Sequence, residues 1–215
     1  MYNPLADPRE LQKEMETTIK QIYNSKEFKT AVEERANAYK RLYYDSSGGP
    51  YLVKADPYFY LRHARNIIEG SPAEKTLFPY LIAYTYKLSP YSLIKTAYYF
   101  PLIFGILSCI IAFFLTAKIS DYWGGFIAGF ILAVHPIFID ATTLGDVDTQ
   151  IMNTFFSLLI AYLFVLLLKS DKNIFRGIYA CLLLITVYLF KLTWGTYYYV
   201  LFILVASLIG YILLT

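Results

Sequence analysis

Charged side chains are scarce in this sequence, and its second half has very few of them. Only 16% of the 215 residues are Asp, Glu, Lys or Arg, and residues 91–215 contain no Glu at all. Soluble domains carry about 25% charged residues. Since 57% of the residues are hydrophobic, the composition argues against a water-soluble globule and predicts a polar segment followed by a membrane domain.

Cysteine and net charge are also low. The two cysteines, Cys109 and Cys181, both lie within apolar runs, so we expect neither a disulfide nor a thiolate metal site. The net charge of +3 is close to neutral for this length, and the basic residues of the first 90 alternate with acids. Nucleic acid is therefore not an expected partner.

Four charge-free stretches come close to or exceed the roughly 20 residues that a helix needs to cross a membrane. A fifth, residues 177–190, is shorter, but Arg176 and Lys191 at its ends can snorkel and extend it. Because backbone groups have no water to bond in lipid, these spans must be helical. The predicted fold is all-α, a polytopic helical membrane protein. Residues 1–90 form a mainly helical first domain and residues 91–215 a transmembrane domain, with spans at about 94–117, 122–140, 148–168, 174–191 and 195–215.

The loops between these spans alternate in charge. The loop near 118–121 has Lys118 with Asp121, and the loop near 169–176 has Lys169, Lys172 and Arg176 with Asp171, which indicates the cytoplasmic side. The loop at 140–148 holds three aspartates and no Lys or Arg, so it is expected to face outward. The same alternation places residues 1–90 outside, as an extracytoplasmic loop.

The two ends of the chain are unusual for a membrane protein. A translocated start normally follows a signal peptide or an earlier transmembrane helix, and the first 75 residues contain neither. The last apolar run stops at Thr215 without flanking charges. We therefore expect the sequence to be a fragment of a longer protein.

The outer region is predicted to be helical over residues 8–43, which are rich in Glu, Lys, Gln and Ala. The Ser-Ser-Gly-Gly-Pro run at 46–50 breaks this helix, and helical spacing resumes over 58–68. The first helix is either a solvated surface or a surface for a partner or lipid headgroups.

Acidic residues at the outer membrane surface are the best candidates for chemistry, because unpaired carboxylates there are costly and often functional. Asp146 and Asp148 directly precede a span, and Asp56 precedes a helix. Carboxylate oxygens suit Mg²⁺ or Mn²⁺. Alternatively, Asp148 caps the helix beginning at Thr149, and Asp56 with the following proline forms an ordinary turn.

Three segments resemble the catalytic subunits of oligosaccharyltransferases. The first matches an Asp-Pro-Trp/Tyr-Phe-x-x-Arg motif of the first outer loop, the second a Pro-x-x-Ile and Gly-x-x-Asp-x-acid motif of the second outer loop, and the third a Trp-Gly-Gly-Tyr segment. In this chain they are Ala55–Arg62 with Arg65, Pro136–Ile139 with Gly145–Gln150, and Lys191–Gly195 with Tyr197.

The resemblance implies an N-terminal portion of such an enzyme, with a GT-C type transmembrane domain. These enzymes transfer an oligosaccharide from a dolichyl or polyprenyl phosphate carrier to Asn in Asn-x-Ser/Thr of an acceptor polypeptide. They hold Mn²⁺ or Mg²⁺ with acids of the first two outer loops and a later glutamate. By this implication Asp56 and Asp148 are catalytic and metal-binding, with Asp146 and Gln150 as further metal ligands.

Two positions depart from the family pattern. Gln150 stands where members have a second acid, and Ala141 stands where many have an Arg. If acid and base had formed a pair, losing both would avoid leaving one charge stranded. The departures also favour an alternative, a degenerate non-catalytic paralogue.

A second alternative is another polyprenyl-phosphate-sugar GT-C transferase, similar to protein O-mannosyltransferases. The first-choice function remains metal-dependent N-glycosylation by the full-length protein, with the fragment alone inactive. The expected location is a multi-pass position in a cell membrane of archaeal kind with the active site outside, or in the ER membrane of a eukaryote.

Overall fold

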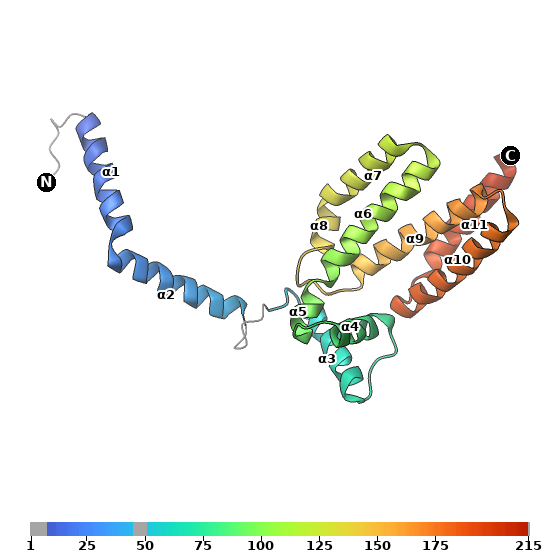
Figure 1. Ribbon diagram of the computed structural model, residues 1–215, viewed down its shortest axis with the longest axis horizontal. Helices are drawn as coiled ribbons and strands as arrows, with labels where there is room; N and C mark the ends of the chain where they lie inside the picture. The colour runs from blue at the N-terminus through green and yellow to red at the C-terminus, as the bar shows by residue number, and fades with distance from the viewer. Residues whose placement is uncertain (1–7, 45–50, 215) are drawn as a thin grey trace. The chain divides into compact units, whose positions relative to one another are not determined.

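The computed structural model describes residues 8–44 and 51–214, and every regular element in these ranges is a helix (Figure 1). The chain divides into two compact units, residues 1–51 and 52–215. Residues 52–90 therefore fold with the apolar helices that follow them rather than with the first two helices.

The first unit contains α1 (Pro8–Asn24) and α2 (Lys26–Tyr43). The sequence predicts a single helix here, but the structure interrupts it at Ser25, whose backbone is extended (φ −66°, ψ 144°). The Ser25 hydroxyl accepts the backbone N–H of Phe28 at 3.2 Å. Serine is a preferred N-cap, so its position explains why a new helix starts there.

The second unit opens with three short helices, α3 (Asp56–Glu69), α4 (Leu77–Leu88) and α5 (Leu93–Tyr98), which pack on one another. A row of aromatic rings joins them to the helices that follow. Tyr60 lies edge-on to Phe78 with centroids 5.0 Å apart, and Phe78 lies edge-on to Phe100 at 6.0 Å. Such pairs add to the burial energy of their rings, so this helical layer is anchored to the bundle.

A bundle of long apolar helices forms the rest of the unit. Within it α6 contacts both α7 and α9, and α9 contacts α10 and, less extensively, α11. Gly125 permits the close α6–α7 approach, because a Cβ there would lie 2.7 Å from the backbone oxygen of Phe113. The helices are α6 (Phe100–Ile119), α7 (Tyr122–Val134), α8 (Pro136–Ala141), α9 (Gln150–Lys169), α10 (Asn173–Thr193) and α11 (Tyr198–Leu214).

Three helical stretches in the described residues are long and apolar enough to cross a membrane: Leu93–Ile119, α9 and α10. The helices in the other two predicted spans are shorter. The stretch predicted at 122–140 is interrupted where His135 turns extended (φ −69°, ψ 126°). Pro136 explains this break, because the residue before a proline is driven out of the helical region.

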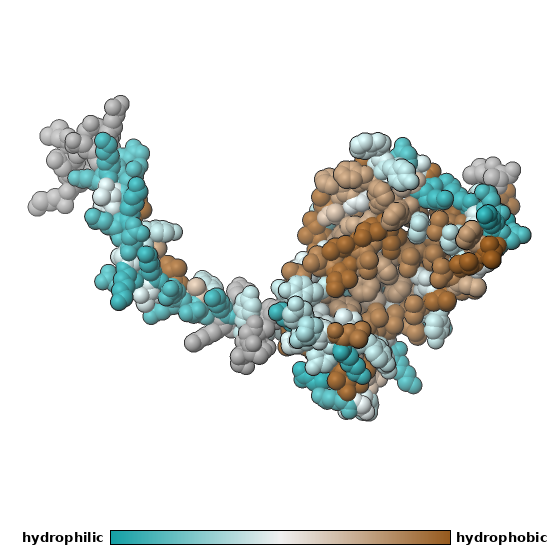
Figure 2. Space-filling model, in the orientation of Figure 1, coloured by the Kyte–Doolittle hydropathy of each residue, from teal (hydrophilic) through white to brown (hydrophobic). Residues whose placement is uncertain are grey.

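The outer surface of the bundle is apolar, as Figure 2 shows by the brown colour over these helices. Ile106 on α6 is 53% exposed, Phe130 on α7 is 58% exposed, and Leu184 on α10 is 71% exposed. Apolar patches of this extent are not stable against water, and lipid is the medium that satisfies them. The surface supports the expected membrane domain.

Candidate functional site

The loops of the bundle gather at two ends of opposite charge. At one end Lys169 donates a hydrogen bond from Nζ to the backbone oxygen of Lys118 at 2.7 Å, which brings the two basic loops together. At the other end the acidic loop at 140–148 lies against residues 52–54 and the end of α5. This second end contains the predicted site residues.

Gly145 fixes the path of the acidic loop. Its N–H donates to the oxygen of Tyr98 at 3.1 Å, and its own oxygen accepts the N–H of Val53 at 3.2 Å. Its φ of +86° lies in the region that only glycine adopts without strain. A Cβ would also lie 2.8 Å from the Tyr98 ring, so this position requires glycine on two counts.

Asp146 is buried and bound by a lysine that sequence reasoning missed. Only 2% of Asp146 is exposed, and its Oδ2 lies 2.5 Å from Nζ of Lys54. Lys54 also lies 3.7 Å from Asp140. The hydrogen bond to Asp146, assisted by the charges of nearby aspartates, raises the pKa of Lys54.

The second carboxylate oxygen of Asp146, Oδ1, has a different environment from Oδ2. Oδ1 of Asp146 is buried and has no hydrogen-bond partner within the described part of the chain. An orphaned buried acceptor is rare in folded proteins. It is therefore the one oxygen of Asp146 that a cation or water could use without displacing Lys54.

Asp148 lies just before α9 and is half-buried. Its Oδ1 accepts the backbone N–H of Thr149 at 2.5 Å, and Thr149 is itself the N-cap residue of the helix. The structure thus makes Thr149 the N-cap, whereas the sequence reading made Asp148 the cap of a helix starting at Thr149. Within residues 8–44 and 51–214, Oδ2 of Asp148 accepts no hydrogen bond. Gln150, the first residue of α9, is exposed.

Asp56 begins α3 and is exposed, while the following Pro57 is buried. Proline is well suited to the first turn of a helix because its missing N–H would be unsatisfied there in any case. Negative charge at this end is also favoured by the helix dipole. Local folding rules therefore account for the position of Asp56 without assigning it a role.

Tyr60 lies one turn after Asp56 in α3. Burial raises the pKa of the Tyr60 hydroxyl, a hydrogen bond with the Thr149 side chain lowers it, and the charges of Asp148 and Asp56 raise it further. The charges of both acids thus influence one hydroxyl, although the acids lie 92 positions apart in the sequence.

The Trp194 segment, the third motif, follows α10, which packs against α4. The Trp194 ring lies 5.7 Å from that of Tyr199 in an edge arrangement. Tyr199 in turn shares a 2.6 Å hydrogen bond with Ser157 of α9. The motif is thus a packed connection between α9, α10 and α11.

The acids at this end make an incomplete metal centre. Among residues 8–44 and 51–214, no three His, Cys, Asp or Glu side chains are grouped so that they could hold a metal ion. Hard cations such as Mg²⁺ take about six oxygen ligands. The carboxylates of Asp56 and Asp148 have the right chemistry for two of them, but the remaining ligands would have to come from elsewhere.

Comparison with known proteins identifies the family. The family model described as "Oligosaccharyl transferase STT3, N-terminal" matches residues 70–215. A dolichyl-phosphooligosaccharide-protein glycotransferase of Methanococcus voltae is 24% identical over 207 residues, covering 80% of this chain and 23% of that protein.

Two solved structures share the fold. The Archaeoglobus fulgidus oligosaccharyltransferase in complex with Zn and sulfate has a TM-score of 0.64 at 23% identity, over 71% of this chain and 22% of its own. Its apo form has a TM-score of 0.63 at 22% identity, over 75% of this chain and 22% of its own. The chain thus spans less than a quarter of the length of these relatives. Because the family model covers more than half of it, the chain belongs to the STT3 oligosaccharyl transferase family.

Proposed function

We propose that the longer protein containing this chain transfers an oligosaccharide from a dolichyl or polyprenyl phosphate carrier to Asn in Asn-x-Ser/Thr sequences. Membership in the family supports this activity. One observation in the structure supports assigning it to particular residues: the backbone N–H of Val53, three residues before Asp56, donates to the oxygen of Gly145, three residues before Asp148, at 3.2 Å. The two acids lie in the two segments that resemble the family motifs.

Amide chemistry explains why carboxylates are needed. The nitrogen of a side-chain amide is a poor nucleophile because its lone pair is delocalised into the carbonyl. Carboxylates that accept hydrogen bonds from both N–H groups would orient the amide and disturb that conjugation. In this proposal Asp56 and Asp148 hold the acceptor amide beside the departing carrier phosphate, where preorganised polar groups contribute most.

We further propose that Mn²⁺ or Mg²⁺ is bound by Asp56 and Asp148, with Oδ1 of Asp146 and the side-chain carbonyl of Gln150 as additional ligands. Such a cation would neutralise the charge that develops on the leaving phosphate. Ion pairing of Asp146 with Lys54 supports a lesser role for that residue. The acidic end is proposed to face away from the cytoplasm in a cell membrane.

The test is glycosylation of an Asn-x-Thr peptide by the full-length protein in the presence of Mn²⁺. Asp56→Ala and Asp148→Ala are each expected to lower the rate about 100-fold or more, the size seen when one stabilising group is removed from an active site. Asp140→Ala is the matched control, since Asp140 lies at the end of α8, just before the loop that contains Asp148, with its side chain 72% exposed. Its rate should stay close to that of the parent.

Binding of Mn²⁺ to the same variants, followed by electron paramagnetic resonance, separates metal ligation from catalysis. Weaker binding in Asp56→Ala and Asp148→Ala than in Asp140→Ala supports both as ligands. Full activity in both variants would contradict the site assignment. An inactive parent protein would favour the non-catalytic alternative, for which Gln150 and Ala141 are the sequence evidence.

A further inference from the structure

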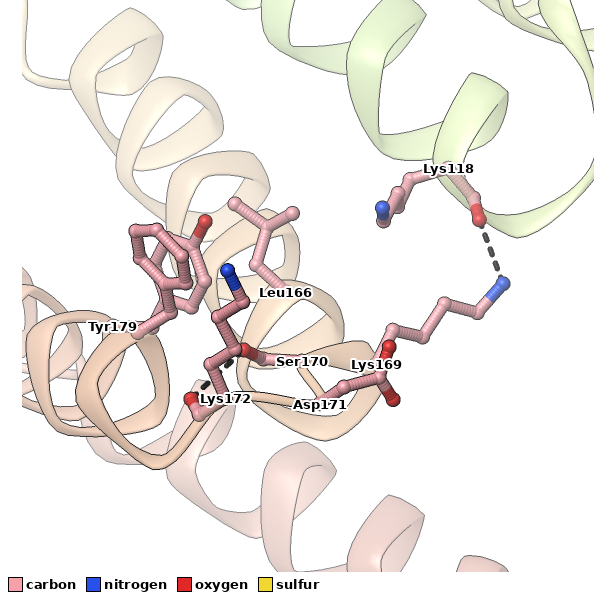
Figure 3. A pocket seen from close by; sticks show the side chains of 8 residues that line it. Lys118, Leu166, Lys169, Ser170, Asp171, Lys172 and Tyr179 are labelled. Atoms are coloured by element: carbon pink, nitrogen blue, oxygen red, sulfur yellow. Dashed lines mark hydrogen bonds between the residues drawn. The ribbon is translucent and has the colours of Figure 1, made fainter.

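A pocket of about 260 Å³ lies at the basic end of the bundle, away from the acidic loop. It is formed where the α6–α7 turn meets the connection between α9 and α10 (Figure 3). Its lining joins charged side chains to apolar and aromatic ones: Lys118, Leu166, Lys169, Ser170, Asp171, Lys172, Phe175 and Tyr179.

The positive charge of this pocket is not neutralised by the protein. Three lysines face one aspartate, and none of the three has an acidic partner within 4.0 Å among the described residues. Lys169 is held by the backbone oxygen of Lys118 at 2.7 Å. Figure 3 shows the Lys118 amine turned toward Leu166, with the Lys172 amine on the other side of that residue. Three lysines with one aspartate leave an excess of positive charge in the lining, which a bound anion would offset.

The adjoining helix end also favours an anion. Helix α10 begins at Asn173, and its N-cap residue Lys172 gives no side-chain hydrogen bond to the first turn. By contrast, the start of α7 is capped by Asp121, which accepts the N–H of Gly124 at 2.7 Å. Uncapped N–H groups and the positive end of the helix dipole together attract phosphate.

The residues around the pocket favour a lipid as the source of a bound phosphate. The apolar surface of the bundle gives way to hydrophilic colour near the connection between α9 and α10 (Figures 1 and 2), which is where lipid headgroups would meet the hydrocarbon if these helices span a membrane. Leu166, Phe175 and Tyr179 offer apolar contact beside the lysines. Basic pockets between transmembrane helices on the cytoplasmic side suit anionic headgroups. We propose that this pocket binds the phosphate of an anionic membrane lipid, a role separate from the acidic site.

The experiment compares lipid retention by the full-length protein in nanodiscs of phosphatidylglycerol and phosphatidylcholine, measured by native mass spectrometry. Lys118→Gln, Lys169→Gln and Lys172→Gln combined should lower phosphatidylglycerol retention strongly, by a factor of about five for each lysine. The control combines Lys87→Gln, Lys95→Gln and Lys191→Gln, which removes the same charge elsewhere. It should retain phosphatidylglycerol like the parent.

Leu166→Trp is a second variant that fills the pocket and keeps every charge. It should also lower retention, whereas unchanged retention would overturn the proposal of a pocket. If both triple variants lose the same amount of phosphatidylglycerol, the lipid is held by general electrostatic attraction and not by this pocket. That result would also overturn the proposal. Inorganic phosphate is added as a competitor, and displacement of the lipid by millimolar phosphate would assign the site to a soluble ion instead.

Discussion

The two ends of the bundle handle charge in opposite ways. At the acidic end, Asp146 is paired with Lys54 and Asp148 is bonded to Thr149, while the loop itself is tied to Tyr98. At the basic end the lysines have no acidic partner in the described residues. A charge that is satisfied internally fixes the geometry around it, whereas an unsatisfied charge is open to an external ligand. The geometry of the first end is therefore fixed by its own contacts, and the second end has charge available to an external ligand.

Among the changes that test this contrast between the two ends, removing Lys54 should lower the stability of the protein most. Lys54→Met leaves Asp146 buried without its partner, and breaking such a pair costs about 3–5 kcal/mol. We expect about 3 kcal/mol, the low end, because the Lys54 side chain is 41% exposed. The measurement is the free energy of unfolding of the full-length protein in detergent micelles.

The double variant Lys54→Met with Asp146→Asn provides the control. Asn carries no charge, so the double variant should recover much of the stability that Lys54→Met loses. A double variant no more stable than Lys54→Met would mean that Lys54 acts through its packing and not through the ion pair.

Gly145→Ala should have the next largest effect, about 2 kcal/mol. The variant forces a side chain into a left-handed conformation at φ +86° and against the Tyr98 ring. Gly177→Ala is the matched control, because a Cβ at Gly177 in α10 meets nothing within 4 Å. That change should be neutral or stabilise the helix by up to about 1 kcal/mol. Equal thermal midpoints for the two variants would contradict the assigned role of Gly145.

Much of the architecture could be predicted from the sequence, because membrane helices are encoded by long local runs. The helices α9 and α10 agree with the predicted spans to within a few residues. The break before Pro136 and the interruption at Ser25 depend on single residues inside otherwise favourable runs. Local chemistry explains both once they are observed, but a hydropathy average does not reveal them.

The candidate site was harder to predict than the helices. Motif resemblance singled out Asp56 and Asp148, and the structure joins the segments that contain them through the hydrogen bond from Val53 N–H to the Gly145 oxygen. Lys54 escaped notice because nothing in the local sequence links it to Asp146, 92 positions later. Ion pairs between distant segments depend on tertiary packing, so a sequence can show which charges are scarce but not which of them are already paired.

The smallest expected effect is a dependence on pH that separates the two ends. The folded protein raises the pKa of Lys54 above its ordinary value, which is about 10.4 in an unfolded chain. The stability that its charge supplies is therefore fully present below about pH 10 and is lost as the pH rises through the higher folded pKa. The stability difference between the parent and Lys54→Met should stay constant between neutral pH and about pH 10 and shrink at higher pH.

Lys169→Gln at the basic end should differ from the parent by only about 0.5 kcal/mol at neutral pH, since Lys169 has no acidic partner within 4.0 Å in the described chain. A Lys169→Gln variant as unstable as Lys54→Met would show that the basic end is held together by the protein itself, and the contrast between the two ends would be lost.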